Sequence, residues 1–239
     1  MDDRVIDCQP NPITRFPNYA INYPITRSPD PVINGYHFIS RWRVDGTCGE
    51  VADILGDPLA LTQWWPSVYL KVDERRPPDA RGLGRRVRLE TAGWLPYTIH
   101  WEFEVVESRY PYGFSIAASG DFDGRGEWTF VQDGPVVDIT YDWQLRAEKP
   151  LLRNLSFLLK PLFEANHRWA MARGEESLKL ELARRRAASD AMRAQIAPPP
   201  GPVTYAGAAL VVGAVAVGAG LVYLMRRSRR RRWSRRRTR

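Results

Sequence analysis

The chain has 239 residues and a formal net charge of +8 at pH 7, a length that allows one hydrophobic core with additional segments. The positive charge would favour a nucleic-acid partner, but residues 226–239 contain ten arginines and no acidic residue, which leaves −2 for the rest of the chain. Nucleic acid is therefore excluded as the expected partner of the main body, and it stays only as the second candidate for the arginine tail.

The N-terminal residues 1–34 are polar and interrupted by prolines, so an irregular or disordered arm is predicted. They contain no apolar stretch typical of a signal peptide. The two cysteines, Cys8 and Cys48, form no metal-binding or disulfide-like motif. Both observations favour a reducing compartment, with a single bridge between the two cysteines as the alternative.

The first regular elements are a strand and two short helices. Apolar and polar residues alternate over 36–44, which predicts a half-buried strand. A turn follows, and then short helices are expected over 50–55 and 59–64, the second ending at a Trp-Pro pair.

Alternation continues from residue 67 to residue 147, with turn signals between the segments. This pattern predicts six more strands, in an antiparallel sheet that is covered on one face only. His100, Glu102 and Asp142 are predicted on the solvent face. The residues predicted to face the core are Val87, Leu89, Thr91, Ile99, Trp101, Phe103, Val105, Tyr141 and Trp143.

The cover is predicted to be the long helical stretch that follows. Because proline suits a first helical turn, Pro161 divides the stretch into a lead-in over 151–159 and a main helix over 161–186. Small residues in the middle of the predicted inner face would leave room beneath the helix. That face comprises Leu162, Ala165, Trp169, Ala172 and Leu180, widened by Phe163, Ala170 and Gly174.

Two polar residues, Asn166 and Arg173, project from the same broad side of this helix. One interpretation is that Arg173 forms a solvated pair with Glu176, three residues further on. The other is that Asn166 and Arg173 make polar contacts inside a cavity.

The order of elements resembles a known superfamily, on three features: Asp57-Pro58 and Trp64-Trp65-Pro66 after the first strand, GDFDGRGEW over 120–128, and the closing long helix. These resemble the START-like helix-grip (SRPBCC) superfamily, within it the polyketide cyclase/dehydrase and lipid-transport group. The resemblance covers residues 35–186. It implies an α+β helix-grip fold, a curved seven-stranded antiparallel sheet wrapped on the long C-terminal helix, with an apolar ligand chamber between them. It implies no common set of catalytic residues.

The C-terminal part changes composition three times. Residues 187–204 predict a polar helix and a proline-rich linker, and residues 205–225 contain no charge. An uncharged helix of that length spans about 30 Å, so a single transmembrane helix is predicted over 205–225. The arginine tail, 226–239, is expected to contact anionic lipid head groups.

Two rules predict different membrane topologies for this chain. The arginine tail favours a cytoplasmic C-terminus, whereas the absent signal peptide and the cysteines favour a cytoplasmic soluble domain. We expect a single-pass membrane protein whose soluble domain is cytoplasmic. A shallow helix with both ends inside would satisfy both rules.

Candidate site residues are mostly aromatic. The sequence contains no HExxH, no Cys/His cluster and no phosphate-binding loop, so neither a metal nor a cofactor is expected. Many aromatic side chains on the inner face can be core packing, or they can line a cavity for a flat or lipid-like molecule. The predicted ligand-binding residues are Tyr97, Trp101, Phe103, Trp128, Tyr141, Trp143, Asn166, Trp169 and Arg173.

The sequence therefore predicts membrane-anchored binding or transport of a hydrophobic, lipid-like small molecule, without catalysis. The first alternative is a polyketide cyclase or aromatase-type enzyme that uses polar residues of the cavity. The second is an interaction module that binds no ligand. The interior distinguishes binding from catalysis, because catalysis needs polar groups that converge within hydrogen-bonding distance.

Overall fold

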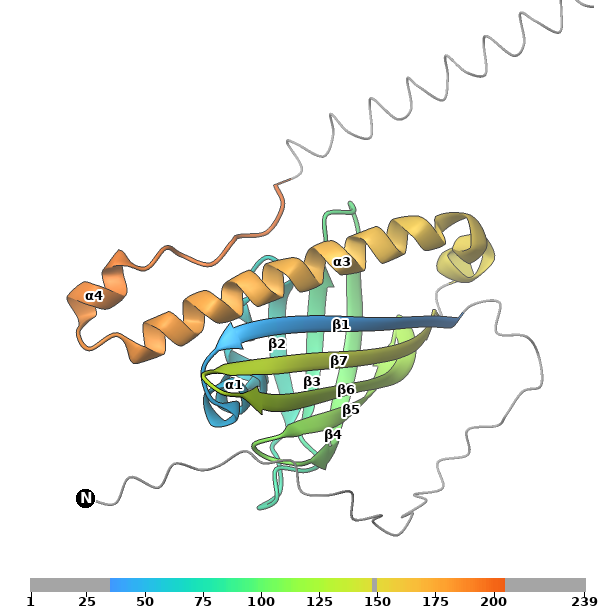
Figure 1. Ribbon diagram of the computed structural model, residues 1–239. Helices are drawn as coiled ribbons and strands as arrows, with labels where there is room; N and C mark the ends of the chain where they lie inside the picture. The colour runs from blue at the N-terminus through green and yellow to red at the C-terminus, as the bar shows by residue number, and fades with distance from the viewer. Residues whose placement is uncertain (1–34, 148–149, 205–239) are drawn as a thin grey trace, which may run out of the picture.

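The computed structural model describes residues 35–147 and 150–204 of the protein (Figure 1). The element order matches the predicted one, a strand and short helices followed by six strands and a long helix. The strands are β1 (Gly35–Asp45), β2 (Tyr69–Arg76), β3 (Arg86–Ala92), β4 (Thr98–Ser108), β5 (Gly113–Gly120), β6 (Phe122–Asp133) and β7 (Val136–Ala147). The helices are α1 (Cys48–Leu55), the 3-10 helix η1 (Pro58–Ala60), α2 (Leu61–Trp64), α3 (Pro150–Arg186) and α4 (Asp190–Gln195).

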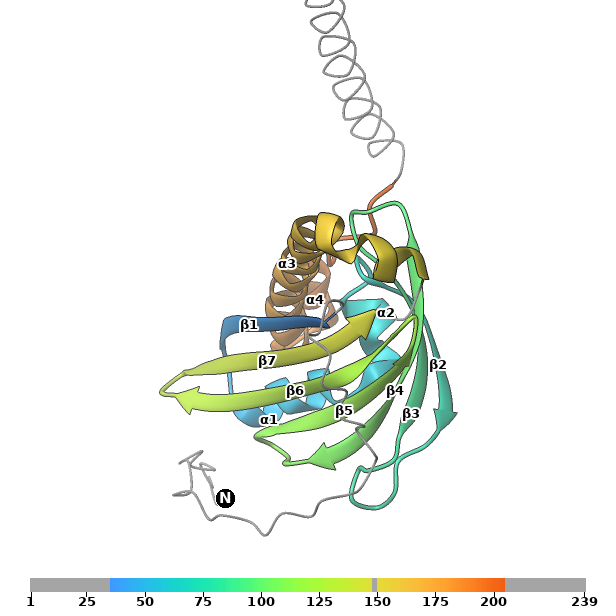
Figure 2. The same ribbon diagram turned by 90° about the vertical axis from the view of Figure 1, so that its right-hand side faces the viewer.

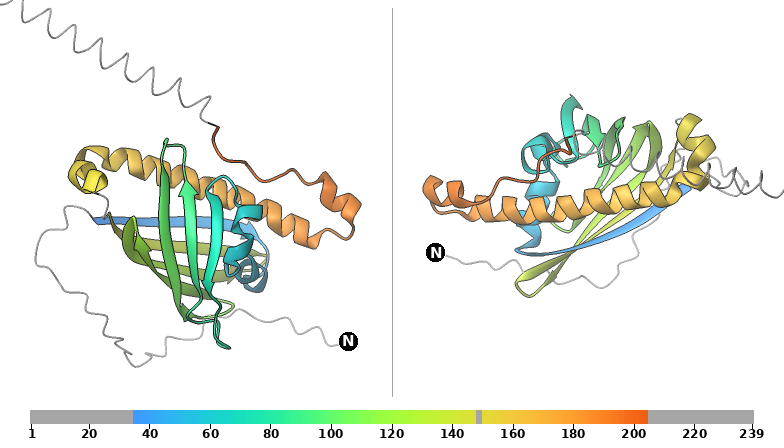
Figure 3. Two further views of the ribbon diagram at one scale, coloured as in Figure 1. Left: turned by 180° about the vertical axis from the view of Figure 1, so that it is seen from behind. Right: turned by 90° about the horizontal axis from the view of Figure 1, so that it is seen from above.

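The seven strands form one antiparallel sheet in the order β1-β7-β6-β5-β4-β3-β2. Consecutive strands from β2 to β7 are neighbours, and β1 joins the free edge of β7. The sheet curves around α3, which lies along its concave side (Figures 1 and 2). Helices α1 and α2 lie beneath the C-terminal half of α3, with α2 next to β2 (Figure 3). This arrangement is the α+β helix-grip architecture that the resemblance implied.

The predicted register of the sheet is confirmed. Val87 and Leu89 are fully buried, Trp101 is 7% exposed, and His100 next to it is exposed. Leu89 lies opposite Trp101 and is packed with it on the inner face. On the outer face Glu102 forms an ion pair with Arg88 at 2.7 Å, as alternation between the two faces requires.

The long helix differs from its prediction in two ways. It is one helix from residue 150 to residue 186 with Pro161 inside it, and its first turns run at an angle to the rest (Figure 1). A proline within a helix removes one backbone hydrogen bond, and here it bends the helix without ending it. The predicted inner face is also wrong in part: Leu162 and Ala172 are exposed and Trp169 is only partly buried, whereas Gly174 is buried as predicted. Within residues 161–186 of α3, the buried residues are Met171, Gly174, Ser177, Leu178 and Leu182.

The buried face of α3 is rotated about the helix axis relative to the predicted face, and a small residue explains why. A side chain at Gly174 would overlap the indole ring of Trp65, the C-cap of α2, so the helix backbone lies directly against this ring. Close approach there turns Ala172 outward. The room expected beneath Gly174 is therefore occupied by Trp65.

Hydrogen bonds between residues close in sequence cap the N-terminus of α1. Thr47 is its N-cap, and the Thr47 hydroxyl and the Glu50 carboxylate form a capping box. The helix consequently begins at Cys48, two residues before the predicted start.

The structure describes only part of the C-terminal region for which predictions were made. In the described part of the chain, no helix is both long and apolar enough to cross a membrane. The predicted span, 205–225, lies outside the described residues, as do the arm, 1–34, and the tail, 226–239.

Candidate functional site

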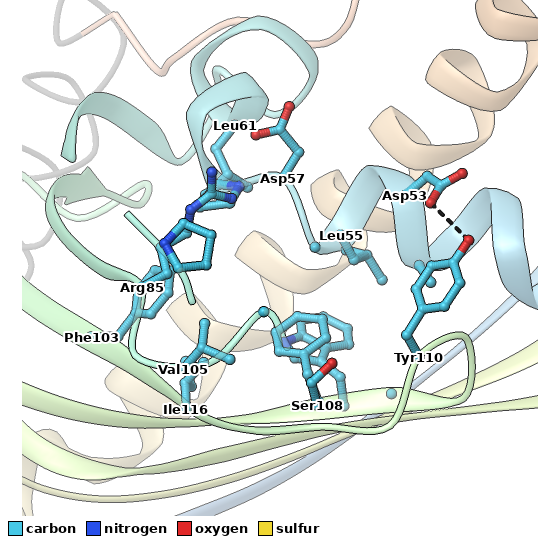
Figure 4. Close-up of a pocket in the computed structure, with 18 of the residues that line it drawn as sticks. Asp53, Leu55, Asp57, Leu61, Arg85, Phe103, Val105, Ser108, Tyr110 and Ile116 are labelled. Carbon is cyan, nitrogen blue, oxygen red and sulfur yellow. Dashed lines mark hydrogen bonds between the residues drawn. The ribbon is translucent and has the colours of Figure 1, made fainter. Parts of the chain in front are cut away.

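A first cavity of about 320 Å³ lies between the short helices and strands β4 to β7. Its interior is apolar, because inward-facing positions of neighbouring strands place large side chains side by side on one surface. Figure 4 shows Phe103, Val105 and Ile116 on the sheet side and Leu55 and Leu61 on the helix side. Phe114 and Trp128 complete this apolar wall.

Polar groups gather at the rim of the first cavity (Figure 4). Tyr110, which is 63% exposed, donates a hydrogen bond from its hydroxyl to Asp53 at 3.2 Å. The negative charge of that carboxylate raises the pKa of Tyr110. Asp57 accepts the backbone N–H of Leu59, and Arg85 pairs with Glu74 at 2.9 Å. With Arg85 neutralised in this way, the rim presents two carboxylates.

A second cavity of about 180 Å³ lies beneath the N-terminal half of α3. Aromatic side chains from β1, β7 and the helix are among the residues that line it, including Tyr36, Trp143 and Phe163. Ala170 of α3 also lines it, so the room predicted beneath the middle of the helix is found at this residue. No lysine, arginine, aspartate or glutamate is among the described residues that line it.

Asn166 fixes one side of the second cavity. Its side-chain oxygen accepts the backbone N–H groups of Trp94 and Leu95, at 3.0 and 3.3 Å. A side chain at Gly93 would collide with this amide, so glycine lets the β3–β4 connection approach the helix. Asn166 therefore holds that connection, which also contributes Tyr97 to the cavity wall.

His167, on the next position of the helix, is kept neutral. Its ring stacks on Phe38, with centroids 4.2 Å apart, and its Nε2 lies 3.2 Å from the Ser40 hydroxyl. Burial, together with the nearby charge of Arg168, lowers the pKa of His167 to about 4. At neutral pH the imidazole is an uncharged member of the wall.

The tyrosines of the interior are also neutral. Burial raises the pKa of Tyr97 to about 12 and also raises the pKa of Tyr69 and of Tyr141. The hydroxyl of Tyr36 is buried and has no hydrogen-bond partner among the described residues. These groups can donate hydrogen bonds to a ligand, but at neutral pH they do not ionise.

The predicted site residues divide into three groups. Tyr97, Trp101, Tyr141, Trp143 and Asn166 line the second cavity, and Phe103 and Trp128 line the first together with Trp101 and Tyr141. Trp169 lines neither and packs against the core. Arg173 lines neither, and its guanidinium pairs with Glu176 at 2.8 Å, as the solvated interpretation predicted.

Sequence reasoning missed several lining residues. Trp65 and Tyr69 lie on both cavities, His167 on the second, and Asp53 at the rim of the first. The Trp-Trp-Pro motif was a signal for Trp65, but nothing in it shows which of the two indoles faces the sheet. The described residues contain no group of three or more histidine, cysteine or acidic side chains that could hold a metal ion.

No protein-family model and no curated protein matches this chain in sequence. Solved structures match its fold. A protein of Thermus thermophilus has a TM-score of 0.51 at 14% identity, over 64% of this chain and 100% of that one. The Zhui aromatase/cyclase from Streptomyces sp. R1128 has a TM-score of 0.52 at 16% identity, over 65% of this chain and 98% of that one. The chain thus has the same helix-grip fold as these two proteins.

Proposed function

We propose that this protein binds a hydrophobic, lipid-like small molecule between the sheet and α3. The observation that carries the proposal is the pair of cavities, both lined mainly by apolar and aromatic side chains. Sites for small molecules in proteins have this character, with a few polar groups that orient the ligand. Here those groups are neutral hydroxyls and an amide inside, and carboxylates at the rim of the first cavity.

The protonation states of the interior support binding over catalysis. A general acid or base works best when its pKa lies near the operating pH. Burial raises the pKa of Tyr97 and Tyr141 and lowers that of His167, so each moves away from neutrality. Such groups position a ligand and do not exchange protons with it at neutral pH.

Membrane anchoring belongs to the same proposal and is supported by the uncharged stretch 205–225 and the arginine tail. After α4 the described chain runs back along α3, and its last segment lies near the turn between β3 and β4 (Figures 1 and 2). That connection lines the second cavity. An anchor starting at 205 would therefore hold this cavity close to the membrane. The soluble domain belongs in the cytoplasm in this proposal, because the two cysteines form no disulfide-like motif.

Native mass spectrometry of the detergent-purified full chain tests the binding proposal. We expect a bound mass that organic extraction releases as an apolar molecule. Absence of any such mass, together with no uptake of an added hydrophobic fluorescent probe, would contradict it and favour the ligand-free interaction module. Labelling of an engineered Ser234→Cys with an impermeant reagent in intact cells tests the topology, and the cytoplasmic domain predicts that it is labelled.

An enzyme of the cyclase or aromatase type is the second candidate. One observation favours it: Tyr110 and Asp53 meet at the rim of the first cavity within hydrogen-bonding distance. Turnover would appear as a changed ligand mass over time, and Asp53→Asn would abolish that change. A ligand whose mass stays constant favours binding alone.

A further inference from the structure

The two cavities are separated by four shared side chains, Trp65, Tyr69, Trp101 and Tyr141. Each of these residues lines both cavities, so together they form the wall between them. We call this wall the partition. Its members come from the α2–β2 segment, β4 and β7. The partition decides whether the interior is two chambers or one.

Trp65 is a member of the partition that is held by packing. Its indole N–H is buried and has no hydrogen-bond partner among the described residues. The indole of Trp101, in contrast, donates to the Thr91 hydroxyl at 3.1 Å. Trp65 packs against Trp42 and Tyr69 with ring centroids 5.5 and 5.2 Å away, and Gly174 of α3 lies directly over it.

Cavity size indicates that one chamber alone is small for a ligand. Sites for drug-sized molecules in proteins measure about 300–1,000 Å³. The first cavity, at about 320 Å³, lies at the lower end of that range, and the second, at about 180 Å³, lies below it. Joined end to end, the two lie well inside the range. A ligand that uses the whole interior is therefore elongated and must pass Trp65.

We propose that Trp65 is a movable partition, and that one elongated, uncharged molecule occupies both cavities once its ring is displaced. The inference rests on the proposed binding function and adds the shape and charge of the ligand. An uncharged ligand follows from the second cavity, whose described lining has no charged side chain and whose histidine is neutral. Short ligands occupy the first cavity without moving the ring.

The test uses two uncharged probes, octanol and hexadecanol, and the full chain labelled with 5-fluorotryptophan. The fluorine resonance of Trp65 is assigned by its absence in Trp65→Phe, and that of Trp64 by its absence in Trp64→Phe. Trp64 is the matched control, because it is buried next to Trp65 but lines neither cavity. We expect hexadecanol to shift the Trp65 resonance and octanol to leave it in place, with Trp64, which contacts the Trp65 ring but no ligand, shifting less than Trp65.

Affinities give an independent readout. Trp65→Phe removes part of the partition, so we expect hexadecanol to bind about tenfold tighter while octanol changes less than about twofold. In Gly174→Ala the added methyl meets the Trp65 ring and pushes it into the cavities, so hexadecanol should bind more weakly than in the unaltered protein. This second variant keeps the test decisive if Trp65→Phe does not fold.

The outcomes separate the two hypotheses. Hexadecanol binding that leaves the Trp65 resonance and the affinities of both variants unchanged overturns the movable partition but keeps the binding function. Equal shifts from octanol and hexadecanol also overturn it, because the ring would then respond to any ligand. Binding of neither alcohol contradicts the binding function itself, and the partition fails with it.

Discussion

The Glu50 carboxylate and the Arg186 guanidinium meet in a two-bond ion pair, with Nε–Oε1 at 2.6 Å and Nη2–Oε2 at 2.7 Å. The two residues are 136 positions apart in sequence. The pair ties the first turn of α1 to the last turn of α3, and Arg186 also donates to the Asp45 carbonyl. The hydrogen bond from Arg186 is the main reason why the pKa of Glu50 is lowered to about 2.

Replacing Glu50 with glutamine should lower the free energy of unfolding by about 1 kcal/mol at pH 7, a modest value because the pair is partly exposed to solvent. Glutamine keeps the acceptor of the capping box, so the variant isolates the charge. A folded-state pKa below the ordinary 4.5 means that the stabilisation is present above pH 4.5 and is lost as the pH falls through about 2. Urea unfolding across this pH range measures it.

The matched control is Glu176→Gln, which removes the exposed partner of Arg173 on the same helix. It should change the free energy of unfolding by less than about 0.5 kcal/mol. Equal losses in the two variants would show that the Glu50 pair has no special part in holding the end of α3.

His167 should make the protein less stable in mild acid. Its pKa in the folded state is about 4, below the ordinary 6.5, so between these values the unfolded state binds more protons. The free energy of unfolding should therefore fall as the pH drops from about 6.5 to about 4, by up to about 3 kcal/mol. His167→Phe can stack on Phe38 and does not titrate. The difference between the two stability curves should be confined to that pH interval, and parallel curves would refute the assignment.

The sheet could be predicted well because its signal is local. Alternating residues decide which face of a strand is buried, and the inward positions of Leu89, Trp101 and Tyr141 follow from that period alone. The same reasoning failed on α3, because apolar periodicity locates the most hydrophobic stripe and not the place of closest approach. Ser177 carries no hydrophobic signal, yet it is buried in the core, and Gly174, although predicted on the inner face, contacts Trp65 where room was expected.

The candidate site could be predicted only in part. Its sheet residues follow from the register, but its separation into two cavities depends on where α2 places Trp65. That placement depends on contacts between segments far apart in sequence. The ion pair of Glu50 with Arg186 has the same origin, since no local pattern joins residues at that distance.

Asn166 is expected to control the β3–β4 connection. In Asn166→Ala the backbone N–H groups of Trp94 and Leu95 lose their acceptor, and leaving such donors unpaired costs about 1–3 kcal/mol when they are buried. Hydrogen exchange of these two amides should accelerate. Asn166→Asp is the matched control, because a carboxylate oxygen can accept the same two bonds. Unchanged exchange in the alanine variant would mean that the connection is held by other contacts.

A negative charge on the ligand should weaken its binding when the length of the ligand is kept constant. Palmitate and hexadecanol have the same chain length, but palmitate carries a carboxylate. Both ends of the interior disfavour it, since the described lining of the second cavity has no charged side chain and the rim of the first carries Asp53 and Asp57. We expect palmitate to bind at least about tenfold more weakly than hexadecanol in competition with a fluorescent probe.

The double variant Asp53→Asn with Asp57→Asn should reduce this discrimination, because it removes both carboxylates of the rim. Asp79→Asn is the control, as Asp79 lies on a nearby loop, pairs with Arg81 and lines neither cavity. Tighter binding of palmitate than of hexadecanol by the unaltered protein would show that an unpaired cation, and not these carboxylates, receives the head group.

The last prediction concerns the space beneath α3. Ala170 lines the second cavity, so Ala170→Leu should fill part of it and weaken the binding of hexadecanol. Ala172, two residues further on, is exposed, and Ala172→Leu makes the same chemical change on the outside of the same helix. We expect a loss of about tenfold in affinity for the first variant and less than about twofold for the second. Thermal unfolding separates a filled cavity from a damaged core, because overpacking a site without free space destabilises by about 1–3 kcal/mol. If Ala170→Leu unfolds more easily and its remaining folded fraction binds hexadecanol normally, Ala170 is a packing contact and the ligand does not reach it.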